Sequence, residues 1–259
     1  MAASDPPPAR DYAHAPARVR AFYRAHNRRQ TYEWARAKEA EYARLDRARL
    51  SAWDVLEQLE RTTDASDPDT EASQLEHALQ TAERARRSGQ PEWLVLVALL
   101  HDAGKILESF GEPDWAVVGD TFPLGCAFQE AVIFAHEFEH NPDASEPRFA
   151  TPCGIYEPGC GLDAVQFCFG HDAYLERVLR DHLPEEALYV IRYHSFYAQH
   201  QERAYDHLCN ARDRALMRWV RRFQPLDLYS KADASVDGQA LRERYRELCE
   251  RWLPHPLRW

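Results

Sequence analysis

The most apolar stretch of the chain is an eight-residue run, 93–100, without a charged side chain. A helix that is apolar on every side is typical of a protein core, and the run is far shorter than the roughly 20 residues that cross a membrane. Because Pro91 suits the first turn of a helix, we predict a buried helix from there to about Leu107. The run leads into His101 and Asp102, which must be hydrogen-bonded, paired or metal-bound if they are buried, because a bare buried charge is costly.

Helical spacing of apolar residues dominates the rest of the sequence. Residues 16–60 are rich in Ala, Arg, Glu and Leu and predict one or two long helices. Further helices are predicted at 74–88, 171–182, 184–199, 211–223 and 238–252, with Pro225 opening a short segment, and loops at 64–69, 111–126 and 141–163. No alternating pattern predicts a strand. The sequence therefore predicts an all-α fold with a single domain at 10–259 and a disordered tail at 1–9.

Two histidines lie on the apolar faces of predicted helices. His171 shares its face with Tyr174 and Leu175, and His194 follows Ile191 on the core face of the next helix. A single core histidine is usually just a hydrogen-bonded core residue. Two of them beside a buried His-Asp pair are better explained by a shared cation, because neutral imidazole is a strong ligand for transition metals.

Two more polar residues join this group. His77 borders a helix face of small residues, which allows close helix packing, and Asp227 lies between two leucines. The candidate metal ligands are His77, His101, Asp102, His171, His194 and Asp227. Four imidazoles and two carboxylates suit two metal ions with a bridging carboxylate, and the nitrogen and oxygen donors favour iron or manganese. The simpler alternative is that His101 and Asp102 cap a helix and the other histidines are ordinary core residues.

Composition narrows the class of protein. The 259 residues carry 32 basic and 42 acidic side chains, a net charge of −10, which argues against nucleic acid or an anionic membrane as the partner. The N-terminus lacks the apolar core of a signal peptide, so we expect a cytoplasmic protein. The six scattered cysteines predict reduced thiols, with a Cys153–Cys160 pair as the weaker alternative.

Seven segments resemble, in order and spacing, the myo-inositol oxygenase family of the HD-domain superfamily. They are HALQTAE (77–83), LLHDAGKIL (99–107), FGEPDWAVVGDTFPLGC (110–126), GIYEPGCGLD (154–163), GHDAYL (170–175), IRYHSFY (191–197) and FQPLDLYSK (223–231). The resemblance covers essentially the whole chain. It implies a helical HD-type fold and an enzyme that cleaves the ring of myo-inositol with O2 to give D-glucuronate and water.

The resemblance also implies the cofactor and the roles of the ligands. The cofactor is a mixed-valent Fe(II)/Fe(III) pair with a bridging hydroxide or oxide. One iron takes His77, His101 and Asp227, the other takes His171 and His194, and Asp102 bridges them. Asp102 and Lys105 are the implied catalytic residues.

The resemblance further assigns a polyol site, whose substrate-binding residues are Arg10, Asp64, Ala65, Ser66, Lys105, Gly119, Asp120, His194 and Ser195. The short polar side chains in this set, together with its few charged ones, suit a neutral, hydroxyl-rich small molecule. Asp64 and Ser66 are also good turn residues, and Lys105 is also explained as a cation at a helix C-terminus. We expect a monomer.

Three alternatives remain at this stage. An HD-type phosphohydrolase would want several cationic groups facing two metals, and near the motifs the sequence offers Lys105 and little else. A related di-iron oxygenase would act on another cyclitol or on an aminophosphonate. A catalytically inactive binding protein would not need the complete ligand set.

Overall fold

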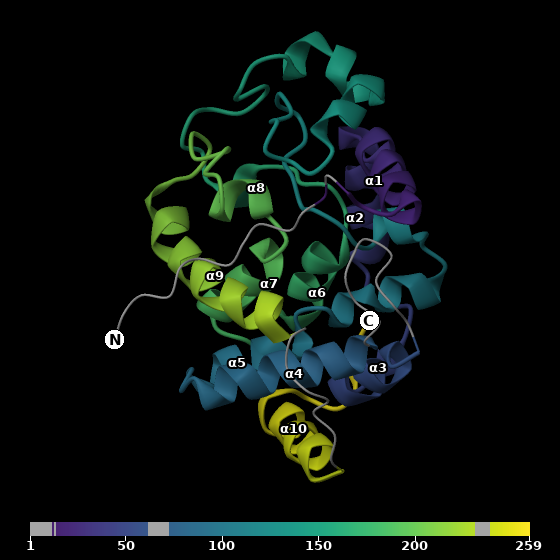
Figure 1. Ribbon diagram of the computed structural model, residues 1–259, viewed down its shortest axis with the longest axis vertical. Coiled ribbons are helices and arrows are strands. Elements are labelled where there is room, and N and C mark those ends of the chain that lie inside the picture. Colours follow the sequence, from purple (N-terminus) through teal and green to yellow (C-terminus); the bar gives the residue numbers. More distant parts are fainter. Residues whose placement is uncertain (1–11, 13, 62–72, 231–238) are drawn as a thin grey trace.

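The computed structural model describes residues 12, 14–61, 73–230 and 239–259, and it is mostly helical (Figure 1). The α-helices are α1 (Ala17–Arg29), α2 (Tyr32–Tyr42), α3 (Ala52–Leu59), α4 (Gln74–Arg87), α5 (Glu92–Leu100), α6 (His171–Leu179), α7 (Glu185–Tyr193), α8 (Tyr197–His200), α9 (Ala211–Ser230) and α10 (Gln239–Trp252). Short 3-10 helices are η1 (Ala103–Phe110), η2 (Asp114–Ala116), η3 (Ala135–His140), η4 (Pro142–Ser145), η5 (Pro147–Phe149) and η6 (Leu162–Ala164). The predicted all-α fold is confirmed. The tail predicted at 1–9 lies outside the described residues.

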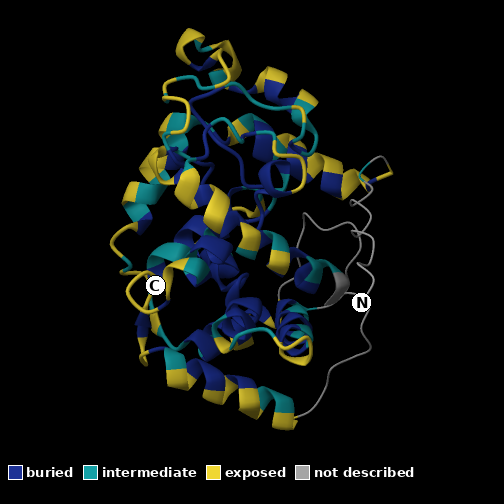
Figure 2. Ribbon diagram, turned by 90° about the vertical axis from the view of Figure 1, so that its left-hand side faces the viewer, coloured by how far each residue is buried: buried dark blue, intermediate teal, exposed yellow. Residues whose placement is uncertain are grey.

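Helix α5 is the centre of the fold. Its residues 94–100 are all buried, and it packs against α4, α7, α9 and α10. Most of the buried apolar residues in the described ranges form one cluster, and Figure 2 places buried residues in the interior, with exposed residues on the outward helix faces. None of the helices in the described part of the chain is both long and apolar enough to cross a membrane.

The N-terminal region forms three shorter helices rather than one or two long ones. Between α1 and α2 the chain leaves the helical conformation at Gln30, whose buried amide exchanges hydrogen bonds with the backbone of Phe169 over 2.7 and 3.1 Å. Thr31 then caps the next helix through its side-chain oxygen. The contact between Gln30 and Phe169, which are far apart in the sequence, therefore ends α1. The local composition around Gln30 does not predict this contact.

The helix predicted at 184–199 is also broken. Helix α7 ends at Tyr193, and α8 starts at Tyr197. The carbonyl oxygen of His194 accepts from the His200 ring at 3.0 Å, and that of Ser195 accepts from the backbone N–H of Thr121 at 2.9 Å. Neither bond follows the helical hydrogen-bond pattern, so the helix does not continue. Helix α6 likewise ends at Leu179, before the predicted position 182.

Helix α9 is longer than predicted. It runs through Pro225 to Ser230, although a proline inside a helix removes a hydrogen bond and crowds the preceding turn. Leu226 and Asp227, just beyond the proline, are both buried, and α9 packs against α4, α5 and α7. Tertiary packing therefore outweighs the local signal to stop.

Two two-residue strands, β1 (Arg49–Leu50) and β2 (Leu257–Arg258), pair antiparallel, which the sequence did not predict. Beside them Trp259 is fully buried, and its indole N–H donates to the Leu50 carbonyl at 3.1 Å. All six cysteines are free, as expected.

Glu83 joins α10 to α4 through a buried carboxylate. It accepts hydrogen bonds from Arg86 at 2.7 Å, from Arg87 at 2.8 Å and from the Tyr245 hydroxyl of α10 at 3.0 Å. The bond from Arg86, with help from Arg87 and Tyr245, outweighs burial and lowers the pKa of Glu83 to about 2.

We expect Glu83→Gln to lower the midpoint of thermal unfolding at about pH 7. A hydrogen bond to a charged group contributes about 1.5–3 kcal/mol, and each kcal/mol moves the midpoint by about 2–4 °C in a chain of this size. Because the pKa of Glu83 in the folded state lies below its ordinary value of 4.5, this stability is lost as the pH falls from about 4.5 toward 2. Unfolding scans at about pH 7, 4 and 3 measure the effect, with exposed Glu247→Gln as the control. A pH-independent difference would contradict the prediction.

Candidate metal centre

The six predicted ligands meet where several helices begin or end. His101 caps the C-terminus of α5 and Asp102 follows it, His171 opens α6, and His194 caps the C-terminus of α7. His77 comes from α4 and Asp227 from α9. Burying a helix terminus is unfavourable unless its polar groups find partners, so converging helix ends make a polar site inside an apolar core.

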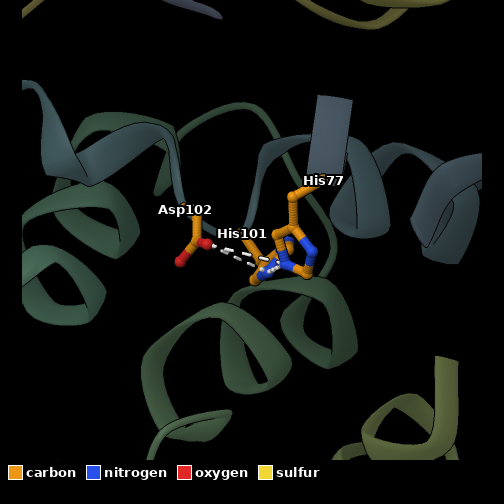
Figure 3. A group of neighbouring side chains, drawn as sticks. All are labelled: His77, His101 and Asp102. Atoms are coloured by element: carbon orange, nitrogen blue, oxygen red, sulfur yellow. Dashed lines mark hydrogen bonds and ion pairs between the residues drawn. The ribbon is translucent and has the colours of Figure 1, made fainter. Parts of the chain in front are cut away.

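One half of the centre contains His77, His101 and Asp227. The two Nε2 atoms are 3.3 Å apart, and Asp227 Oδ1 lies 2.9 Å from that of His77 and 3.5 Å from that of His101. Asp102 Oδ2 completes this group at 3.8 and 3.4 Å from the same two nitrogens. Figure 3 shows the two imidazoles and the Asp102 carboxylate pointing toward one another.

The other half contains His171 and His194, whose Nε2 atoms are also 3.3 Å apart. Here the other oxygen of Asp102, Oδ1, lies 3.4 Å from His171 Nε2 and 3.8 Å from His194 Nε2. Each pair of histidines therefore faces its own oxygen of one carboxylate. This arrangement suits two cations that share Asp102 as a bridge.

Three of the histidines are oriented by backbone carbonyls. The Nδ1 atoms of His101, His171 and His194 lie 3.1, 2.8 and 2.8 Å from the carbonyl oxygens of Ala98, Val117 and Ile191. A proton on Nδ1 satisfies each carbonyl and leaves the Nε2 lone pair facing the centre, which is how proteins commonly orient metal-binding imidazoles.

The electrostatics favour positive charge at this place. Burial raises the pKa of Asp102, but His101 and Lys105 outweigh it and hold that pKa well below its usual range. Burial likewise opposes ionisation of Asp227, and the hydrogen bonds with His101 and His77 lower its pKa well below normal. Buried carboxylates that stay ionised need a cation close by, either a proton on a neighbouring imidazole or a metal ion.

Close backbone contact holds the two halves together. The helix predicted to reach Leu107 ends at Leu100, and the chain continues as the tighter η1. A Cβ atom on Gly104 would lie 2.2 Å from the carbonyl oxygen of His171, a distance that real structures do not tolerate. Only glycine allows η1 to approach the start of α6 so closely. This contact brings Asp102 and His171 within reach of each other.

Lys105, predicted to act on the substrate, lies at the edge of the centre. Its ammonium is buried and donates to Asp102 Oδ2 at 2.8 Å and to Gln74 Oε1 at 2.9 Å. The ammonium therefore contacts one of the six candidate ligands directly, which a cation that only faces a helix end would not do. Sequence reasoning missed Gln74, because an amide at the start of α4 carries no signal of its distant partner.

Sequence reasoning also missed Asp172. Its buried carboxylate lies 2.7 Å from His171 Nε2 and accepts hydrogen bonds from the hydroxyls of Thr121 and Ser195. Burial lowers the pKa of His171, but Asp172 and Asp102 raise it more strongly, to about 10. The available signal was a second His-Asp pair at 171–172, matching the one at 101–102.

The remaining predicted substrate residues divide into two groups. Gly119 adopts φ = +100° beside the Phe22 ring, and Asp120 is buried with Oδ2 accepting from the Ile133 N–H at 3.2 Å. Both lie on the loop whose next residue, Thr121, bonds to Ser195. Four predicted residues, Arg10, Asp64, Ala65 and Ser66, lie outside the described residues.

Comparison with known proteins gives a consistent result. A sequence model of the family "Myo-inositol oxygenase" matches residues 16–259. The chain is 44% identical over 248 residues to inositol oxygenase 1 of Arabidopsis thaliana, covering 93% of this chain and 80% of the relative. It is 41% identical over 257 residues to inositol oxygenase of Homo sapiens, covering 96% and 90%. The chain therefore belongs to the myo-inositol oxygenase family.

Proposed function

We propose that this protein is an inositol oxygenase that uses two iron ions and O2 to cleave the ring of myo-inositol, giving D-glucuronate and water. The observation that carries the proposal is Asp102, whose two oxygens face separate pairs of histidines. Such a carboxylate suits a dinuclear centre, and the all-nitrogen-and-oxygen donor set suits iron. One chain supplies all six ligands, so we propose that a monomer is active.

We propose a division of the six ligands between the two metals that the distances support. His77, His101 and Asp227 would hold one iron, and His171 and His194 would hold the other. Asp102 would bind both irons, and a hydroxide or oxide would be a further bridge between them. The pair would be mixed-valent Fe(II)/Fe(III). When bound, it would supply the one-electron chemistry with O2 that protein side chains lack.

The protein's own residues would bind and orient the polyol. Lys105, held by Asp102 and Gln74, would donate a hydrogen bond to a substrate hydroxyl near the metals. Ser195 and Asp120 would contribute acceptors for hydroxyl groups. Burial of Lys105 and Ser195 keeps bulk water from competing for these bonds.

The HD-type phosphohydrolase is the weaker candidate, because the surroundings of the centre are acidic. Asp120 and Asp172, which are not among the six candidate ligands, are both buried there, and the ammonium of Lys105 is bonded to Asp102. Carboxylates accept hydrogen bonds from neutral hydroxyls but repel a phosphate group.

We predict two metal ions per chain. His171→Ala and His194→Ala should each remove about one ion, because each deletes a ligand from the same half of the centre, and both should lose activity while keeping their helicity. Elemental analysis and circular dichroism measure this. The matched control is His136→Ala, whose side chain is 70% exposed and should leave both ions in place. A single zinc ion per wild-type chain would refute the dinuclear interpretation.

Lys105→Ala should reduce turnover at least about 100-fold with both metals still bound, because the substrate loses the donor that orients it. The control is Lys38→Ala, which removes a lysine paired with Glu112 and should leave turnover unchanged. If Lys105 only faced a helix dipole, its loss would cost about 0.3–1 kcal/mol of stability and spare activity. Normal turnover by the metal-loaded variant would therefore contradict its proposed role.

The reaction itself is tested by O2 uptake with myo-inositol and by assay of glucuronate. We expect oxidation of free myo-inositol, little turnover of inositol phosphates and no phosphate release from nucleotides. Asp120→Asn should raise KM, because a charged acceptor makes the stronger hydrogen bond. Phosphate release from a nucleotide, with no O2 consumed alongside myo-inositol, would overturn the proposal in favour of the phosphohydrolase.

A further inference from the structure

Asp172 is buried beside the candidate metal centre, and its carboxylate accepts hydrogen bonds from two side-chain hydroxyl groups. It is 1% exposed, its Oδ2 accepts from Thr121 Oγ1 at 2.8 Å, and its Oδ1 accepts from Ser195 Oγ at 3.4 Å. His171 Nε2 lies 2.7 Å from the same Oδ1. A carboxylate this deeply buried is costly unless its oxygens are satisfied, so the surrounding groups hold it in one orientation.

Three segments from distant parts of the sequence meet at this carboxylate. Thr121 follows Asp120, Ser195 follows His194, and Asp172 itself follows His171. The backbone N–H of Thr121 also donates to the Ser195 carbonyl at 2.9 Å, which fixes the first two segments to each other. Asp172 thus connects one half of the metal centre to the candidate polyol site.

The contact determines which kind of hydrogen bond Ser195 can offer. A hydroxyl has one donor and two acceptor lone pairs. Once its proton is directed at Asp172, only lone pairs remain for another partner. A hydrogen bond to a carboxylate is stronger than one to a neutral group, so a substrate oxygen does not easily recapture the proton.

We propose that Asp172 is a positioning residue that makes Ser195 an obligate hydrogen-bond acceptor, so that the site selects a substrate with a hydroxyl donor at that position. This inference rests on the proposed function, because it takes Ser195 to contact the polyol. A substrate lacking that hydroxyl would leave the Ser195 lone pairs unpaired in a buried site, which costs affinity.

The decisive experiment is a double-mutant cycle on Asp172→Asn and Ser195→Ala. The dissociation constant for myo-inositol is measured by calorimetry without O2, on metal-loaded protein, so that binding is read separately from turnover. Each single variant should weaken binding about tenfold with metal content unchanged. The double variant should be no weaker than Ser195→Ala alone, because Asp172 acts through that hydroxyl. Asp213→Asn is the control: it alters another fully buried carboxylate, one that holds the backbone N–H of Leu162, and should leave the dissociation constant unchanged.

A panel of monodeoxy-inositols tests the donor selection directly. One member should bind wild type about tenfold more weakly than myo-inositol. Asp172→Asn, whose neutral amide holds the Ser195 proton less strongly than a carboxylate does, should discriminate less than threefold. If Asp172→Asn does not fold, Thr121→Val, which removes the hydroxyl on Oδ2, should move both measurements in the same direction.

The outcomes separate the two proposals. Loss of metal from Asp172→Asn, or additive effects in the cycle, would overturn the positioning role. A wild type that binds myo-inositol without consuming O2 would overturn the oxygenase alone, and the cycle would still decide the role of Asp172. A wild type that does not bind myo-inositol would overturn both.

Discussion

The structure depends on a buried carboxylate that faces two directions. Asp102 stays ionised in the core, and its two oxygens are directed at separate pairs of imidazoles. An ionised group in a low-dielectric interior must be surrounded by compensating charge and hydrogen bonds. The convergence of helix ends, the carbonyls that orient the histidines, and the ammonium of Lys105 all serve that requirement.

Much of the fold could be predicted from the sequence, because apolar periodicity and the unbroken run at 93–100 are local signals. The boundaries that were wrong have another cause. Gln30 ends α1 by bonding to Phe169, the carbonyl groups of residues 194 and 195 end α7, and packing carries α9 through Pro225. Phe169 is remote from Gln30, Thr121 is remote from Ser195, and α4 and α5 are remote from the part of α9 that they pack against, so no short window of sequence contains these contacts.

In the candidate site, too, some residues could be predicted from local sequence and others depend on contacts that only the folded chain makes. Polar residues in apolar or small-residue surroundings led to all six candidate ligands, and the structure brings those six side chains together. The family resemblance supplied the metal identity and the substrate, which spacing alone left open. Gln74 and Asp172 were missed because an amide and a carboxylate are common near helix N-termini, and only the folded chain reveals what they touch.

The all-round burial of α5 has a consequence for how the chain folds. A helix without a polar face has no stable solvated form, so α5 is protected only when α4, α7, α9 and α10 have closed around it. These partners span residues 74–252, and ordering such distant segments slows folding because long loops must close first. His101 and Asp102 follow α5 directly, so the polar pocket that they help to line is complete only when the same four helices are in place.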